Sequence, residues 1–425
     1  MEVWEGGSIK EYTSLPLYPL LLHTPILPYL PYSHTPILPT RPNLNYKIAH
    51  IITKLELGGA QQNTLYTLAH LNRARFQPIL ITGREGVLIE DANRLQGVTR
   101  YYLPSLIREV NPVQDFKALL EIRRILIKEK PVIVHTHSSK AGIVGRWAAK
   151  LAGVPFIIHS IHGFGFHDHQ NFLQQKFFIF LERITSPITT RFIAVSRANI
   201  EKGIGLNLFH SSQVSLIRSG IEIASFRDVV LDRPVKLKEL GLPPDVPLVG
   251  MIACFKPQKA PLDFIEMAYL VHQQIPEAHF LMVGDGELRP QIEARIQALH
   301  LAQVVHLVGW RRDVPEILHL LNILVLTSLW EGLPRVFPQA MAAGVPIVAT
   351  CVDGAPEAVR EGLNGYLLPP RDIKGLAEKV IYLLRHPDLA RKMGQEGTRL
   401  VDEFDIDDMV RQQEELYLTL LNSFR

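Results

Sequence analysis

The stretch SLWEGLPRVFPQAMAAGVPIVATCVDGAPEAVREGLNGYLLPP (328–370) carries the most informative pattern in this chain. A carboxylate, Glu331, precedes a glycine-containing turn and a helical segment, and an amide, Gln339, follows eight residues later. The run VPIVAT (345–350) is typical of a buried strand, and DGAPE (353–357) of a turn. In a parallel sheet, this order brings the polar side chains and a helix N-terminus to the edge where ligands bind.

Short apolar runs alternate with helical segments on both sides of this stretch. Strands are expected at 47–52, 78–82, 131–137, 155–162, 190–196, 214–220, 247–255, 278–286, 304–310, 322–328, 345–350 and 365–370. Helices are expected at 60–71, 113–130, 260–274 and 337–343, and a C-terminal helix at about 406–424. The alternation predicts an α/β fold, with parallel sheets covered on both faces.

The length of 425 residues and the two series of strands predict two domains. We expect a first domain over 46–222 and a second over 223–425, with the polar segment 222–246 as the linker. Ligands of open parallel sheets bind outside the carboxyl ends of the strands, so the natural site is the cleft between the domains.

The first 45 residues have a different composition. Eight prolines lie between Pro16 and Pro42, HTPILP occurs twice, and no charged residue lies between Tyr12 and Thr40. Prolines at this density argue against a membrane-spanning helix. We expect a poorly ordered leader, and the alternative is a proline-rich docking segment or a loose membrane contact.

Composition and missing motifs exclude several classes. A formal net charge of +3 does not fit an electrostatic binder of nucleic acid, and two cysteines in the whole chain exclude a disulfide framework. The sequence has no GxGxxG, GxxxxGK[ST], HExxH or CxxC motif, which lowers the expectation of a nicotinamide dehydrogenase, a P-loop NTPase or a zinc hydrolase.

Three further segments follow expected strands. LGGAQ (57–61) would let the backbone approach an anion at a helix N-terminus, although a tight turn without a ligand is equally consistent with it. IHGFG (161–165) places His162 at a strand end, where a structural role is the alternative. KPQKAP (256–261) offers Lys256 and Lys259 to a diphosphate, and surface lysines are the alternative.

Taken together, these segments resemble the retaining glycosyltransferases of family 4, also called glycosyl transferases group 1. The resemblance covers about 46–425 and includes GGAQ, VHTHSSKAG (134–142), HSIHGF, AVSRA, IRSGIE, KPQKAPLDFIEMA, VGDGELR, VGWRRDVPEIL, SLWEGLP and AMAAGVPIVAT. It implies a GT-B fold, with two facing Rossmann-like doubly wound domains and a C-terminal helix that crosses back to the first.

Carried over residue by residue, the resemblance implies two catalytic candidates, Glu331 and His162. It implies nine donor-binding candidates around the diphosphate, the sugar and the base, namely Gly58, Gly59, Lys259, Gly309, Trp310, Arg311, Gly332, Leu333 and Gln339. No metal and no cofactor are expected, because the nucleotide-sugar is a substrate.

Two positions depart from the family pattern. Gln339 replaces the second acid of an E-x7-E motif, and an amide can still donate to and accept from sugar hydroxyls. Cys254 replaces an arginine five residues before the lysine, so the diphosphate loses a bidentate partner that Lys256 or Arg335 would have to replace.

The expected function is transfer of a sugar from a nucleotide-sugar to a saccharide or lipid-linked acceptor, with retention, in cell-surface polysaccharide or lipopolysaccharide biosynthesis. The alternatives are a nucleotide-sugar epimerase of the same fold and a non-catalytic sugar-nucleotide binding protein. We expect a cytoplasmic enzyme, with a peripheral position on the inner face of the cytoplasmic membrane as a further option. For FLQQKFFIFLERI (172–184), a core helix is preferred over an amphipathic membrane segment.

Overall fold

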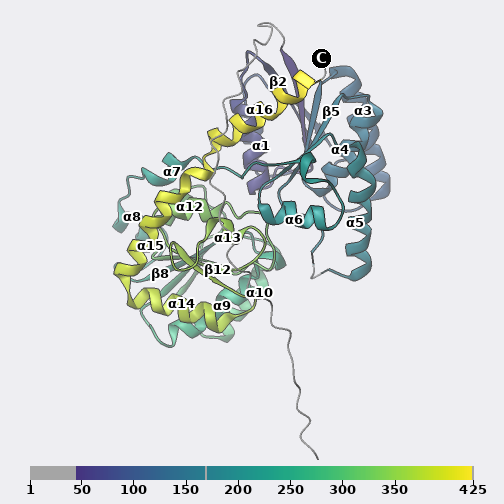
Figure 1. Cartoon of the computed structure of the whole chain (residues 1–425). Coiled ribbons are helices and arrows are strands. Elements are labelled where there is room, and N and C mark those ends of the chain that lie inside the picture. The colour runs from purple at the N-terminus through teal and green to yellow at the C-terminus, as the bar shows by residue number, and fades with distance from the viewer. Residues whose placement is uncertain (1–44, 168–169, 424–425) are drawn as a thin grey trace, which may run out of the picture. The chain divides into compact units, whose positions relative to one another are not determined.

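The computed structural model describes residues 45–167 and 170–423 (Figure 1). The leader predicted for residues 1–45 lies almost wholly outside the described residues. Everything that follows concerns the unit that begins at Asn45.

The first half of the described chain forms a seven-stranded parallel sheet, ordered β3-β2-β1-β4-β5-β6-β7. The strands are β1 (Tyr46–Ile52), β2 (Phe76–Gly83), β3 (Thr99–Leu103), β4 (Ile133–His137), β5 (Phe156–Ile161), β6 (Arg191–Ala194) and β7 (Val214–Leu216). The central strands β4 and β5 are buried at every residue, because helices cover both faces of the sheet. The order reverses between β1 and β4, and this is where ligands of doubly wound sheets bind.

The helices of this half are α1 (Gly59–His70), α2 (Ile89–Arg94), α3 (Pro112–Glu129), α4 (Ser139–Leu151), α5 (Phe172–Thr185) and α6 (Arg197–Gly205). The ends of α3 show why such helices form where they do. The Asn111 side chain accepts a hydrogen bond from the backbone N–H of Gln114, and Pro112 occupies the first turn. Lys130 adopts a left-handed conformation with φ 52°, which ends the helix.

The second half of the described chain forms a six-stranded parallel sheet, ordered β10-β9-β8-β11-β12-β13. Its strands are β8 (Leu248–Ile252), β9 (His279–Val283), β10 (Val305–Leu307), β11 (Ile323–Leu326), β12 (Ile347–Thr350) and β13 (Gly365–Leu368). Its helices are α9 (Pro261–His272), α10 (Arg289–Ala298), α11 (Val314–Leu318), α12 (Val336–Ala342), α13 (Ala355–Ala358), α14 (Ile373–Arg385) and α15 (Pro387–Leu400). Both halves are therefore doubly wound α/β sheets, as the sequence predicted.

The segment between the two sheets is folded, which corrects its description as a linker. It contains α7 (Ile223–Arg227) and α8 (Arg233–Glu239). Leu237, Leu240 and Leu242 are buried in the core of the second half, so this segment is part of that half. Charged residues and prolines suggested a linker, but they alternate with leucines that reach the core.

The C-terminal helix α16 (Ile406–Ser423) packs against the first sheet and not the second (Figure 1). Its buried face, which includes Met409, Tyr417 and Leu421, belongs to one core cluster with residues of β1, β2, β4 and β5. The expected return of this helix to the first half is confirmed.

The chain crosses between the halves at two neighbouring places. Ile221 donates to the carbonyl of Phe404 at 2.8 Å and accepts from the N–H of Ile406 at 3.1 Å. A Cβ on Gly220 would lie 2.4 Å from Cα of Ile406, so only glycine allows the two segments to lie this close.

The preference for a core helix at 172–184 was wrong. In α5 only Ile179 and Thr185 are buried. Five large apolar side chains of this helix are exposed, namely Phe172, Leu173, Phe177, Phe180 and Ile184. The 3.6-residue pattern was correct, but it does not reveal how much of the apolar surface meets a neighbour.

Candidate functional site

Ten of the eleven predicted site residues line one cavity of about 820 Å³ at the carboxyl ends of the strands. They are Gly58, Gly59, His162, Lys259, Trp310, Arg311, Glu331, Gly332, Leu333 and Gln339. The remaining residue, Gly309, directly precedes Trp310 and has a positive φ of 68°, which glycine adopts at little cost. Residues from both sheets meet in this cavity, as expected, and their individual roles stay predictions.

The first sheet contributes the N-terminus of α1 to the cavity. Gly58 is its N-cap residue with extended backbone, and no acidic side chain lies in the first turn. A Cβ on Gly59 would lie 2.8 Å from Cδ of Arg335, which also lines the cavity. The positive end of this helix therefore lies beside a cation, and such an arrangement favours an anionic ligand.

Two glycine-containing loops, one from each half, touch at the cavity. A Cβ on Gly332 would lie 2.0 Å from the carbonyl oxygen of His162 and 3.1 Å from the backbone nitrogen of Gly163. Any side chain at position 332 would push the two loops apart. Gly332 therefore allows Glu331 and His162 to lie at the same cavity.

The second sheet contributes an ion pair between a half-buried lysine and a buried carboxylate. The Lys259 ammonium donates to Oε1 of Glu331, which also accepts from Oγ of Ser328 at 2.6 Å. The backbone N–H of Glu331 donates to Asp353 at 2.6 Å, so the loop that carries the carboxylate is fixed as well. Glu331 is 7% exposed, and this burial strengthens its attraction to the cation.

Arg335, one of the two cations proposed to replace the arginine missing at Cys254, lines this cavity. Its Nε donates to the carbonyl of Gly220 at 3.0 Å, and its Nη1 donates to Gln62. Burial lowers the pKa of Arg335 to about 10, and it stays charged at neutral pH. Lys256, the other proposed replacement, instead lies 3.3 Å from Glu56 and lines a neighbouring cavity.

The guanidinium of Arg311 is held by acidic side chains. It donates to both carboxylate oxygens of Asp313, at 2.8 and 2.6 Å, and to Glu239. These bonds raise the pKa of Arg311, and they fix the loop that carries Trp310. Trp310 itself is 48% exposed, which leaves its ring available at the cavity.

His162 is the neutral member of the site. Its Nε2 lies 3.1 Å from Nδ1 of His137, and its buried Nδ1 has no hydrogen-bond partner among the described residues. Burial, and then the charge of Arg335, lowers the pKa of His162 to about 4. The ring is therefore uncharged near pH 7.

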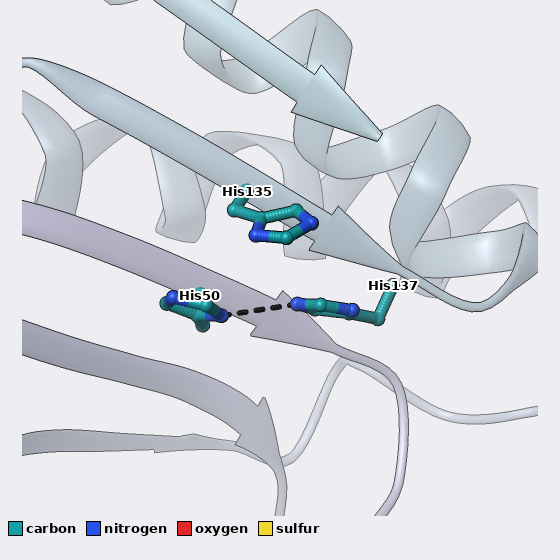
Figure 2. Close-up of side chains that lie close together, drawn as sticks. All are labelled: His50, His135 and His137. Atoms are coloured by element: carbon teal, nitrogen blue, oxygen red, sulfur yellow. Dashed lines mark hydrogen bonds between the residues drawn. The ribbon is translucent and has the colours of Figure 1, made fainter. Parts of the chain in front are cut away.

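A group of buried histidines lies behind His162, and sequence reasoning missed it. Figure 2 shows His50 on β1 and His135 and His137 on β4. One nitrogen of each ring lies within 4.8 Å of the others, so the group is a candidate for holding a metal ion. The signal in the sequence was HTH (135–137), whose alternation places both histidines on one face of a strand.

A second cavity of about 1100 Å³ shares Leu57, Gly58, Gln61, Cys254 and Trp310 with the first. Its lining includes four cationic side chains, from Lys54, Arg108, Lys140 and Lys256. Besides Trp310, three phenylalanines line it, Phe166, Phe177 and Phe178, and the last two belong to α5. The lining also includes four carboxylates, Glu56, Asp115, Glu182 and Asp285, and the first two form ion pairs with the four cations, so an anionic ligand would compete with these pairs.

Two facing doubly wound sheets with one shared cavity define the GT-B class of glycosyltransferases. Two protein-family models match the chain. The model described as Glycosyltransferase Family 4 matches residues 57–225, and the model described as Glycosyl transferases group 1 matches residues 232–400. The chain belongs to this family of glycosyltransferases, so the expected family, the GT-B fold and a glycosyltransferase activity are confirmed.

Two relatives carry informative names. The UDP-Gal:alpha-D-GlcNAc-diphosphoundecaprenol alpha-1,3-galactosyltransferase of Escherichia coli is 32% identical over 378 residues, which are 88% of this chain and 97% of that one. The N,N'-diacetylbacillosaminyl-diphospho-undecaprenol alpha-1,3-N-acetylgalactosaminyltransferase of Campylobacter jejuni is 26% identical over 318 residues, 72% of this chain and 82% of that one.

Solved structures agree on the fold. Anabaena Alr3699/HepE in complex with UDP and glucose has a TM-score of 0.75 at 19% identity and covers 88% of this chain and 99% of its own. WaaG, a glycosyltransferase involved in lipopolysaccharide biosynthesis, has a TM-score of 0.73 at 14% identity and covers 87% of this chain and 99% of its own. Among the described residues, no helix has the length and apolar character needed to span a bilayer.

Proposed function

We propose that this enzyme transfers a sugar from a UDP-sugar to a sugar linked to a polyprenyl diphosphate, with retention of configuration, during synthesis of a cell-surface polysaccharide or lipopolysaccharide. The observation that carries the proposal is the partly buried Lys259–Glu331 pair, which shares a cavity with His162 and the N-terminus of α1. In this scheme residues 46–222 bind the acceptor and residues 223–425 bind the nucleotide-sugar. The name of the Escherichia coli relative supports a UDP-sugar donor, and the names of both relatives support a polyprenyl diphosphate acceptor.

The donor half of the reaction is an electrostatic problem. Breaking a glycosyl–phosphate bond releases a nucleoside diphosphate, and negative charge builds on its oxygens in the transition state. Lys259, Arg335 and the N-terminus of α1 lie at one cavity and are already held by protein contacts. They can stabilise that charge without reorganising. We expect no metal to be needed for this step.

In this proposal, Glu331 stabilises the transferred sugar. As the bond to phosphate lengthens, the sugar gains oxocarbenium character, which a buried carboxylate stabilises. The same carboxylate can accept hydrogen bonds from sugar hydroxyls. Retention would follow if the acceptor hydroxyl attacks on the face that the phosphate leaves, and the family resemblance favours this course.

The acceptor would occupy the cavity of about 1100 Å³. A diphosphate there would have to replace the carboxylates of Glu56 and Asp115 as partners of the four cations, and the aromatic residues suit the first apolar groups of a lipid. Because this cavity shares Gly58 and Trp310 with the donor cavity, an acceptor sugar there would lie next to the transferred sugar.

The exposed apolar face of α5 would rest on the lipid bilayer that carries the acceptor. Phe172, Leu173 and Phe180 are 66%, 75% and 56% exposed. Phe177 is both 48% exposed and part of the acceptor cavity, so the face continues into that cavity. This continuity favours the lipid surface as the occupant, because the lipid chain must leave the cavity on the membrane side. The enzyme would then be peripheral at the inner face of the cytoplasmic membrane.

The transfer is tested with the full chain, a panel of UDP-sugars and an acceptor in which N-acetylglucosamine is linked to a short polyprenyl diphosphate. Mass spectrometry should show one added hexose or N-acetylhexosamine, and NMR of the product should show the donor's anomeric configuration. Glu331→Gln is the inactive control. Binding of UDP-sugar without transfer across the panel, conversion of the donor without an acceptor, or an inverted product would contradict the proposal.

The membrane contact is tested by sedimentation with anionic phospholipid vesicles. The double variant Phe172→Ser, Phe180→Ser should bind vesicles less than the parent chain and keep its activity on a water-soluble acceptor analogue. Tyr382→Ser changes an aromatic residue on α14 that is 43% exposed, and it serves as the matched control. Equal vesicle binding by all three proteins would contradict a lipid occupant. So would a parent chain that is a dimer in solution and becomes a monomer in the double variant, because the face would then bind a second copy of the chain.

A further inference from the structure

A chain of hydrogen bonds runs from the donor cavity to the C-terminal helix through three histidines. His162 bonds His137 with 3.1 Å between Nε2 and Nδ1, and His137 bonds His50 with 3.0 Å between Nε2 and Nδ1. Nε2 of His50 then lies 3.4 Å from the hydroxyl of Tyr417 on α16. The four residues thus form one continuous path. His50 lies in β1, His137 ends β4, His162 follows β5, and Tyr417 lies on α16.

The geometry between His50 and His137 is that of a hydrogen bond and not of a metal site. Their ring planes are 11° apart and the rings meet edge to edge (Figure 2). A metal ion on the line between two facing ring nitrogens needs about 4 Å between them, since each metal–nitrogen bond is about 2 Å long. The observed 3.0 Å leaves no room for the ion.

The third member of the buried group is also fully hydrogen-bonded. Nδ1 of His135 lies 2.6 Å from the Tyr417 hydroxyl, and its Nε2 lies 2.7 Å from Oγ of Ser160. A metal ion bound by His135 would have to break one of these bonds. The contacts therefore explain the cluster as a hydrogen-bond network.

All members of the path are uncharged near neutral pH. Burial lowers the pKa of His50 to about 3 and lowers that of His137 well below its usual value. Burial raises the pKa of Tyr417 well above its usual value, which keeps its hydroxyl protonated. Each ring therefore carries a single N–H.

A neutral imidazole that donates through one nitrogen must accept through the other. The N–H groups of the path therefore all point one way, either toward His162 or toward Tyr417. When they point toward His162, Tyr417 uses its one proton to donate to His50, so its 2.6 Å bond with His135 must be donated by Nδ1–H of His135, and His50 donates to His137. His137 then donates to Nε2 of His162, and the proton of His162 must lie on Nδ1.

We propose that Tyr417, His50 and His137 are positioning residues that hold His162 as the tautomer with its proton on Nδ1. This direction rests on the proposed function, because an N–H attracts the anionic leaving group of a UDP-sugar and a lone pair repels it. Nδ1 of His162 is the one ring nitrogen of the path without a partner among the described residues. This nitrogen is buried, so a ligand atom would supply the missing bond only after a local rearrangement that uncovers it.

The tautomer can be measured without turnover, which separates this inference from the proposed function. The full chain is labelled with ¹⁵N-histidine, and long-range ¹H–¹⁵N spectra distinguish protonated from unprotonated ring nitrogens. His162→Gln assigns the signal. We expect a protonated Nδ1 in the parent chain and a mixture of tautomers in Tyr417→Phe, which removes one buried hydroxyl and keeps the ring.

Kinetics supply a second measurement. Tyr417→Phe should lower kcat by about 10- to 100-fold, by analogy with the loss of a hydrogen-bond partner behind a metal-bound histidine. KM for the donor should change much less. His50→Gln is the second variant, in case Tyr417→Phe does not fold.

The control is His306→Gln. His279 and His306 form a histidine–histidine bond of 2.9 Å in the second sheet, outside the path. This variant should leave the His162 spectrum and kcat unchanged. The proposal would be overturned by an unprotonated Nδ1 in the parent chain, by the same His162 tautomer in the parent and both path variants, or by a stoichiometric transition metal in the purified protein.

Discussion

The two sides of the donor cavity differ in the kind of polar side chain that lines them. The side built on the second sheet is charged, with Lys259, Glu331 and Arg335 held by ion pairs and hydrogen bonds. The side built on the first sheet is neutral, with His162 and the buried rings behind it. We infer that the charged side neutralises the leaving diphosphate, and that the neutral side adds one directional N–H, from His162, toward the same leaving group.

The neutral side should make the protein sensitive to acid, and this is the largest effect that we expect. The folded-state pKa is about 3 for His50 and about 4 for His162, against about 6.5 in the unfolded chain. Between these values the unfolded chain binds more protons, so stability falls as pH falls from about 6.5. From pH 7 to pH 5, His50 and His162 should each lower the free energy of unfolding by about 2 kcal/mol.

Urea unfolding at several pH values measures this loss, and proteolysis at pH 5 should cut the first half before the second. His135, His137 and His159 have lowered pKa values for the same reason and add to the loss. A free energy of unfolding that does not change between pH 7 and pH 5 would contradict the view that the side built on the first sheet depends on uncharged histidines.

On the charged side, Glu331→Ala should reduce kcat/KM for transfer by about 10²- to 10³-fold. The variant loses the carboxylate that faces the sugar and leaves Lys259 with fewer partners. Circular dichroism should show an intact fold. An activity equal to that of the parent chain would exclude Glu331 from the site.

Lys259→Ala should weaken UDP binding by about 30-fold, the equivalent of one hydrogen bond to a charged group. Titration calorimetry measures the affinity directly. Lys374→Ala removes a lysine on α14 that is 84% exposed at its side chain, and it should bind UDP as the parent does. An unchanged affinity in Lys259→Ala would refute its contact with the phosphates.

Gln339→Glu should have the smallest effect and keep or slightly improve donor binding. The position lines the donor cavity, and a carboxylate accepts from ribose hydroxyls at least as well as an amide. UDP-sugar affinities of the two forms provide the comparison. A large loss in the variant would show that this pocket requires the amide.

Much of this site could be predicted because its residues lie in short contiguous motifs. Glu331 and Gly332 follow one strand, and Gly58 and Gly59 follow another, so the parallel topology alone brings them to one edge. The alternation of strands and helices gave the fold class for the same reason.

The buried path could not be predicted from local pattern. His50 and His137 are 87 residues apart, and Tyr417 is 367 residues from His50, so only strand pairing and the return of α16 bring them together. The apolar face of α5 was misjudged because amphipathic spacing does not show what lies opposite it. The segment with α7 and α8 was misjudged because composition does not reveal which leucines reach a core.

The double crossing at Ile221 and Ile406 has a consequence for the order in which the protein folds. The core of the first half includes Ile406, Met409, Val410 and Tyr417, which are synthesised after the whole second sheet. The second half has nearly all of its core in one contiguous stretch, from Ile221 to Phe404. We therefore expect the second half to complete its folding on the ribosome first, which reverses the usual N-terminal-first order.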